Sequence, residues 1–149
     1  LIILKKLIEL ENINIKIDIP NNYKILGVSN ELSQVIINLI QNAKDAFIQN
    51  NTKDKEISIS LKEEEILDKK YAILEIKDNA GGISNENLEK IFEPYFTTKH
   101  KSQGTGLGLF MSKMIIEKSL DGTLNHKNID GGSIFCISIF LNNDMDLTK

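Results

Sequence analysis

The stretch Glu31–Phe47, ELSQVIINLIQNAKDAF, predicts a long amphipathic helix. Its apolar residues recur every three or four positions, the spacing of a helix face that packs on a core: Leu32, Val35, Ile36, Leu39, Ile40, Ala43 and Phe47. A second stripe is polar and mostly uncharged: Gln34, Asn38, Asn42 and Asp45. Glu and Lys form helices better than Asn, so an ordinary solvated face would favour them. This stripe is therefore either a ligand-binding face or a plain surface in an Asn-rich chain.

Composition limits the classes of protein that fit. The 149 residues suffice for one domain with a hydrophobic core, and the net charge of −3 gives no sign of a nucleic-acid or anionic-membrane partner. A single cysteine, Cys136, excludes an internal disulfide and a Cys-based zinc site. No apolar run has the length of a membrane span, and no signal peptide is visible. Because the chain opens with Leu1, we expect a piece of a longer protein, whose other parts could be anchored in a membrane.

Alternation of apolar and polar residues predicts the strands on both sides of this helix. We expect strands at 13–19, 24–28, 57–61, 71–77, 123–127 and 133–140, with a charged, solvated hairpin connection at 63–70 and a turn at 130–132. Further helices are expected at 84–92 and, after a glycine-rich turn, within 104–118, while 1–11 resembles the end of an incoming helix. These elements in mixed order predict an α/β fold, a two-layer sandwich with three helices.

The most apolar strand ends in an acid. Ala72, Leu74 and Ile76 share one face of the strand at 71–77, and Asp78 continues that face, so its carboxylate should have a partner. A carboxylate only accepts hydrogen bonds, and in a pocket it would select a base with an exocyclic amine, such as adenine, over guanine. Gly81 and Gly82 would let the base approach the backbone. The alternative is that Asp78 simply starts a turn.

The stretch GTGLGL, 104–109, has glycines before a helix, so its backbone N–H groups could hold an anion. It is not a dinucleotide-binding fingerprint, which would need glycine where Leu109 stands, and no Gly-Lys-Ser/Thr follows as in a P-loop. A tight loop before a helix is the alternative interpretation.

A metal site is compatible with the polar stripe. Mg²⁺ prefers oxygen ligands and often shares few protein groups with substrate phosphates, so one amide oxygen from Asn42 would suffice. His100 and His126 have no companions at ligand spacing, and we expect both to be surface or loop residues. No Ser/His/Asp or Cys/His nucleophile pattern is present.

Four motifs in order carry a family resemblance: NLIQNAKDA, DNAGGI, IFEPYFTTK and GTGLGL. They resemble the N box, first glycine box, F box and second glycine box of the catalytic and ATP-binding domain of bacterial sensor histidine kinases, in the GHKL superfamily. The resemblance extends from about residue 13 to 141 and implies the Bergerat fold, a mixed sheet of about five strands covered by three helices on one face. One departure is Ala80, where the first glycine box usually has glycine.

The resemblance also implies roles for individual residues. Asn42 would coordinate Mg²⁺, Asn38 would line the phosphate side, and Asp78 would bind the adenine amine. Lys99 or Lys101 would supply a cation near the γ-phosphate. Asn38, Asn42 and Lys99 are thus the catalytic candidates. The nucleotide contacts would come from Asn38, Asn42, Asp78 and Lys99 together with Asp45, Ala80, Gly82, Ile83, Phe92, Phe96, Thr97, Thr98, Gly104, Thr105, Gly106, Leu107, Gly108 and Leu109.

The position of Asn38 bears on the reaction. Hydrolysing members of the superfamily resemble one another in placing a water-activating Glu four residues before the metal-binding Asn, and here a neutral amide stands there. The resemblance therefore favours a protein-histidine kinase that transfers the γ-phosphoryl group of ATP to a His on a separate helical domain. Two alternatives are an anti-sigma-factor-type serine kinase and a non-catalytic nucleotide-sensing docking module.

The expected context follows from the family. Residues 1–12 would end a linker helix from a helical dimerisation and phosphoacceptor domain, and 13–149 would form the ATP-binding domain. A response regulator would act downstream. The domain itself would be cytoplasmic, without nucleic-acid or direct membrane contact.

Overall fold

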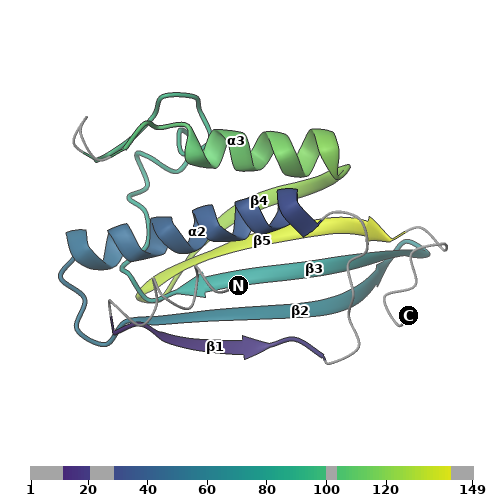
Figure 1. The fold of residues 1–149 in the computed structure, drawn as a ribbon, viewed down its shortest axis with the longest axis horizontal. Coiled ribbons are helices and arrows are strands. Elements are labelled where there is room, and N and C mark those ends of the chain that lie inside the picture. Colours follow the sequence, from purple (N-terminus) through teal and green to yellow (C-terminus); the bar gives the residue numbers. More distant parts are fainter. Residues whose placement is uncertain (1–11, 21–28, 100–103, 142–149) are drawn as a thin grey trace.

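The computed structural model describes residues 12–20, 29–99 and 104–141. Five strands form one sheet in the order β1-β2-β3-β5-β4, and the helices lie on one face of it (Figure 1). β1 pairs with β2 in parallel, and the other pairs are antiparallel. The strands are β1 (Asn14–Asp18), β2 (Glu56–Ile66), β3 (Lys69–Asp78), β4 (Gly122–Ile129) and β5 (Gly132–Leu141). The predicted two-layer α/β sandwich with a mixed sheet is confirmed.

Helix α2 (Ser29–Gln49) packs its predicted apolar stripe on the sheet. Val35, Leu39 and Phe47 are almost fully buried, and Ile36 packs against the core from a partly buried position. At an order of 1.5–3 kcal/mol for each fully buried large apolar side chain, this stripe is a major source of the domain's stability. One face of the helix therefore packs on the core, and the neighbouring polar stripe remains available for another role.

Strand β3 occupies the centre of the sheet, as its apolar sequence predicts, but the connection before it is shorter than expected. β2 and β3 form the expected hairpin, but they stay paired as far as Ile66 and Lys69, so the strands extend through most of 63–70. Leu67 and Asp68 both have positive φ, 52° and 60°, which is the two-residue turn that matches strand twist. The charged residues of this stretch did not end the strands, because both faces of the sheet are open to solvent near the β2–β3 turn.

The predicted helix at 84–92 is wrong. Backbone hydrogen bonds there join residues three apart, as from the Asn87 N–H to the Ser84 carbonyl at 2.9 Å, so the segment is a run of turns. Asn is a poor helix former, and burial of Ile91 anchors the segment independently of any helix. In the described residues the sheet is therefore covered by α2 and by α3 (Gly108–Met114), which continues into the π-helical turn η1 (Ile115–Ser119).

Some expectations fall outside the described residues: the strand at 24–28, the incoming helix at 1–11, and His100. The boundary between 1–12 and 13–149 remains a prediction. No helix in the described part of the chain is both long and apolar enough to span a membrane.

His126 is not the surface residue that the sequence suggested. It lies on β4 opposite Phe135 in the register, and the two ring centroids are 4.8 Å apart. Its Nε2 atom is buried and has no hydrogen-bond partner among the described residues. Burial lowers the pKa of His126 from 6.5 to about 4, because the charged imidazolium would lose its hydration.

This histidine should make the fold sensitive to mild acid. Above pH 6.5 the ring is neutral in both states, but between pH 6.5 and 4 the unfolded chain takes up a proton that the folded chain excludes. The free energy of unfolding should therefore fall between pH 7 and 5, by about 1 kcal/mol once solvent screening of a partly exposed ring is allowed for.

Urea denaturation of the wild type and His126→Phe at both pH values measures this contribution. The variant should show a smaller loss on acidification, and an equal loss in both proteins would contradict the assignment. Asp78, whose pKa is raised, contributes with the opposite sign but equally to both proteins.

Candidate functional site

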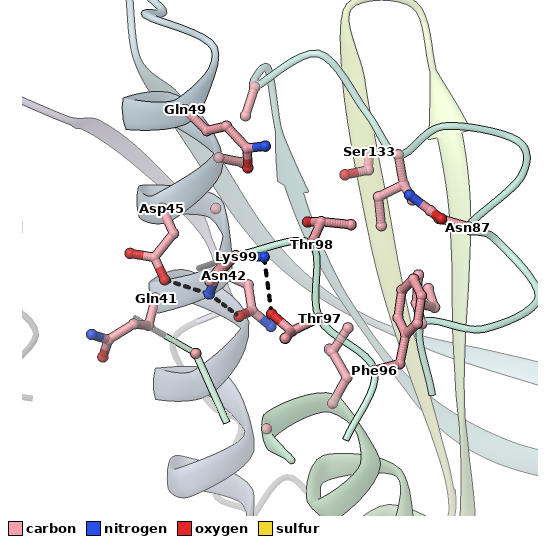
Figure 2. Close-up of a pocket in the computed structure, with 18 of the residues that line it drawn as sticks. Gln41, Asn42, Asp45, Gln49, Asn87, Phe96, Thr97, Thr98, Lys99 and Ser133 are labelled. Atoms are coloured by element: carbon pink, nitrogen blue, oxygen red, sulfur yellow. Dashed lines mark hydrogen bonds and ion pairs between the residues drawn. The ribbon is translucent and has the colours of Figure 1, made fainter. Parts of the chain in front are cut away.

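A cavity of about 800 Å³ lies between α2, the end of β3 and the segments on either side of residues 100–103 (Figure 2). Its size is within the range of about 300–1,000 Å³ that is typical of small-molecule sites. All the predicted ligand-contacting residues except Phe92 and Leu107 line it: Asn38, Asn42, Asp45, Asp78, Ala80, Gly82, Ile83, Phe96, Thr97, Thr98, Lys99, Gly104, Thr105, Gly106, Gly108 and Leu109.

Asp78 is a buried acid in the lining of this cavity, and the residue is only 6% exposed. One carboxylate oxygen accepts the Ala80 N–H at 2.9 Å, and the other accepts the Ser133 hydroxyl at 3.0 Å. Burial raises the pKa of this carboxyl, and these two hydrogen bonds oppose the rise. A carboxylate has about four acceptor positions, so Asp78 keeps capacity for a donor from a ligand.

The polar stripe of α2 faces the cavity in part. Asn38, Asn42 and Asp45 line it, whereas Gln34 is exposed and does not. Asn38 donates from Nδ2 to the buried hydroxyl of Ser112 on α3 at 2.8 Å, and a Cβ on Gly108 would come within 2.6 Å of the Asn38 Oδ1. The second glycine box therefore has glycine at 108 because α3 begins against the Asn38 side chain.

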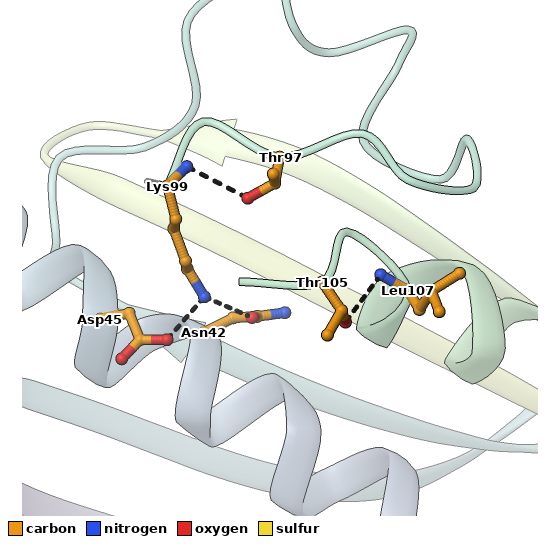
Figure 3. A network of polar contacts seen from close by, with 6 residues as sticks. All are labelled: Asn42, Asp45, Thr97, Lys99, Thr105 and Leu107. Atoms are coloured by element: carbon orange, nitrogen blue, oxygen red, sulfur yellow. Dashed lines mark hydrogen bonds and ion pairs between the residues drawn. The ribbon is translucent and has the colours of Figure 1, made fainter. Parts of the chain in front are cut away.

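Lys99 brings a positive charge into the cavity (Figure 3). Its Nζ is 2.6 Å from Asp45 Oδ2 and 3.4 Å from the amide oxygen of Asn42, and its backbone N–H donates to the Thr97 hydroxyl at 3.1 Å. Lys99 is about a quarter exposed at its side chain, so this ion pair is partly shielded from water. The three side chains place a cation and two oxygen ligands at one end of the cavity.

The F-box aromatics have different positions. Phe96 lines the cavity, but Phe92 turns to the core, where its ring meets Phe135 edge-on with centroids 6.5 Å apart. The ammonium of Lys113 lies over the Phe92 ring, 4.6 Å from its centre. The structure thus gives Phe92 a packing contact and no contact with the cavity.

The second glycine box packs directly on the F box. Gly106 has a φ of +69°, and a Cβ there would lie 2.8 Å from the Phe96 backbone nitrogen and closer still to the Tyr95 carbonyl. Leu107 does not line the cavity; its N–H donates to the Thr105 hydroxyl at 3.3 Å at the start of α3. The glycines therefore permit close backbone packing beside the cavity, as the alternative interpretation of a tight loop before a helix requires. This packing does not exclude contact with an anion.

Metal ligands are few here. The described residues contain no group of three or more His, Cys, Asp or Glu that could hold a metal ion. Asn42 and Asp45 offer oxygen atoms at the Lys99 end of the cavity, which suits a Mg²⁺ ion that takes most of its ligands from phosphates and water. The residues therefore fit a magnesium ion that is shared with phosphates better than one held by protein ligands alone.

Sequence reasoning missed several polar lining residues: Gln41, Gln49, Asn50, Ser84, Asn87 and Ser133. Gln41 and Gln49 follow the helical spacing of Asp45 and could have been found from it. Ser133 could not, because its contact with Asp78 depends on the pairing of β3 with β5, in which the two residues are opposite each other.

Comparisons with known proteins agree with this fold. The sequence profile of the histidine kinase-, DNA gyrase B- and HSP90-like ATPases (HATPase_c) matches residues 27–143. The two-component sensor PprA of Pseudomonas aeruginosa is 36% identical over 115 residues, which are 77% of this chain and 12% of that protein. The sensor histidine kinase ZraS of Salmonella typhimurium is 39% identical over 115 residues, 76% of this chain and 23% of that protein.

A solved structure gives the same result in three dimensions. The catalytic domain of histidine kinase ThkA superimposes with a TM-score of 0.75 at 29% identity, covering 93% of this chain and 86% of that one.

The chain belongs to the family of histidine kinase-, DNA gyrase B- and HSP90-like ATPases. Within that family it is of the sensor histidine kinase type, like the two relatives and the solved domain. The resemblance drawn from the four boxes is confirmed. The chain spans less than a quarter of the length of either curated relative, so it corresponds to one part of such proteins.

Proposed function

We propose that this domain binds Mg²⁺-ATP in the cavity and donates the γ-phosphoryl group to a His on a separate helical domain. The observation that carries this proposal is the set of polar groups that line the cavity. A buried carboxylate with spare acceptor capacity, Asp78, contributes to the same cavity as the Lys99, Asn42 and Asp45 network. The acid suits the amine of adenine, and the network suits phosphates with their metal ion.

Three of these groups would have separate tasks. Asp78 would accept a hydrogen bond from the base and reject guanine, which presents a carbonyl there. Asn42 would give an amide oxygen to Mg²⁺, and Lys99 would neutralise phosphate charge. When bound, the metal ion lowers the charge of the triphosphate. Catalysis by the domain would then consist of positioning and charge neutralisation.

Asn38 supports a kinase over a hydrolase. An amide is too weak a base at neutral pH to activate water, and here it is further engaged with the Ser112 hydroxyl at 2.8 Å. ATP held in the cavity would thus be kept for an external acceptor. The proposed partners are the helical dimerisation and phosphoacceptor domain and, downstream, a response regulator; the proposed location of the domain is the cytoplasm.

The test is phosphoryl transfer with γ-labelled ATP, Mg²⁺ and the cognate helical acceptor domain. We expect label on that domain that is lost in acid and retained in base, as for phosphohistidine. Acid-stable label on a serine would favour the serine-kinase alternative. ATP binding with no transfer at all would favour a docking module.

Lys99 should matter more for transfer than for binding. Among the described residues that line the cavity it is the one cationic side chain, and neutralising the transferring group requires a positive charge. Lys99→Gln should therefore slow phosphoryl transfer by about tenfold or more, while ADP affinity changes less than about threefold. Single-turnover transfer and calorimetry with ADP measure the two effects.

Lys118→Gln is the matched control, because it removes the same charge from an exposed position outside the cavity. Equal losses of ADP affinity and transfer rate in Lys99→Gln would show that Lys99 serves binding alone.

A further inference from the structure

The loop 79–83, which follows Asp78, has little regular structure of its own. Gly81 and Gly82 have φ values of +99° and +77°, where the backbone of other residues is strained. Ala80, Gly82 and Ile83 nevertheless line the cavity next to Asp78. A loop with two permissive glycines needs partners elsewhere in the chain to hold one conformation, because its polar backbone groups must be satisfied.

Asn128 supplies the most complete of these contacts. From β4, its Oδ1 accepts the Ile83 N–H at 2.9 Å and its Nδ2 donates to the Ile83 carbonyl at 2.6 Å. A side-chain amide carries a donor and an acceptor side by side, so it pairs with one residue as a neighbouring strand would. Asp could only accept here, and Ala could do neither.

The contact also shapes the wall of the cavity. A Cβ on Gly82 would lie 2.9 Å from Asn128 Oδ1 and 3.0 Å from the Gly132 carbonyl oxygen, so the loop is packed directly against the Asn128 amide. Two further contacts hold the loop: the Gly81 N–H donates to the Gly131 carbonyl at 3.0 Å, and Asn50, just past the end of α2, donates to the Ala80 carbonyl. Of these three contacts, the one made by Asn128 holds Ile83, the last residue of the loop and the one farthest from Asp78 in sequence.

We propose that Asn128 is a positioning residue for the base of the nucleotide: it holds the backbone of Gly82 and Ile83 so that the base fits against Asp78. This inference rests on the proposed function, since it presumes that the base binds at Asp78. It predicts a specific pattern, because the amide of Asn128 bonds to Ile83 in the loop beside Asp78, whereas Asn128 itself does not line the cavity.

The test compares Asn128→Ala and Asn128→Asp with Asn125→Ala, a matched control on the same strand whose side chain is exposed and does not line the cavity. Affinities for Mg²⁺-ATP, Mg²⁺-GTP and Mg²⁺-tripolyphosphate are measured by displacement of a fluorescent nucleotide, and melting temperatures are recorded in parallel. We expect both Asn128 variants to lose about tenfold in ATP affinity and part of their preference over GTP, with tripolyphosphate affinity unchanged. Asn125→Ala should match the wild type.

A double variant separates positioning from general destabilisation. In an Asp78→Asn background the base contact is already lost, so adding Asn128→Ala should cause less than about a twofold further loss of ATP affinity. Parallel losses for ATP and tripolyphosphate, or the same tenfold loss in both backgrounds, would overturn the inference and leave Asn128 a purely structural residue. Failure of the wild type to bind ATP would instead overturn the proposed function itself.

Discussion

Replacing Asp78 by Asn is expected to weaken ATP binding by about 100-fold and to remove the preference for ATP over GTP. The amide that replaces the carboxylate presents an N–H₂ group to the amine of adenine, so two donors would face each other. Losing a hydrogen bond to a charged group and leaving a buried donor unpaired together cost about 3 kcal/mol. Calorimetry with both nucleotides and Mg²⁺ measures the change.

The same substitution should not unfold the domain. The pKa of Asp78 is raised by burial, so its ionised form destabilises the folded state as pH rises through that pKa, and an Asn carries no such cost. Asn can still accept from the Ala80 N–H and contact the Ser133 hydroxyl. The melting temperature at pH 7 should therefore stay constant or rise.

Asp130→Asn is the matched control, since it removes the same charge from an exposed turn. A lowered melting temperature in Asp78→Asn, or unchanged selectivity, would contradict the role assigned to this acid.

Gly132→Ala is expected to cause the largest loss of stability, about 3 kcal/mol. A Cβ at this position would overlap the Asp78 carbonyl oxygen and lie 2.8 Å and 2.9 Å from the Asp78 carbonyl carbon and the Asn79 Cα. These are backbone atoms where β5 starts beside the end of β3, so they cannot move aside as a flexible side chain would. Urea denaturation at pH 7 gives the free energy of unfolding and its dependence on denaturant.

The adjacent glycine provides a strict control. Gly131 has a φ of +71°, which Asn tolerates better than most residues, and a Cβ there would meet no atom within 4 Å. Gly131→Asn should therefore cost less than about 1 kcal/mol. Similar costs for the two variants would mean that the contact between β5 and Asp78 is not what makes glycine necessary at 132.

Local patterns in the chain predicted a large part of this domain. The three- and four-residue spacing of Leu32 through Phe47 predicted the helix and its buried face, and the alternation ending in Asp78 predicted a central strand with an acid on its buried side. Both patterns arise from burial along one face of a regular element, which depends on residues close in sequence. The strands extend further into 63–70 than expected, and the helix expected at 84–92 is absent; neither segment has a regular buried face to guide the pattern.

The sequence alone therefore determined most of the order of elements, the mixed α/β fold, the family and the majority of the residues that line the cavity, because these depend on local spacing and on four motifs. Only the tertiary structure decided which side chains complete the site. Ser133 reaches Asp78, Asn128 reaches Ile83, and Ser112 reaches Asn38 across separations of 55, 45 and 74 residues. The same level of structure partly buried His126 and placed Phe92 away from the cavity. Such contacts depend on strand register and on how the helices pack on the sheet, and neither is encoded in any single stretch of the chain.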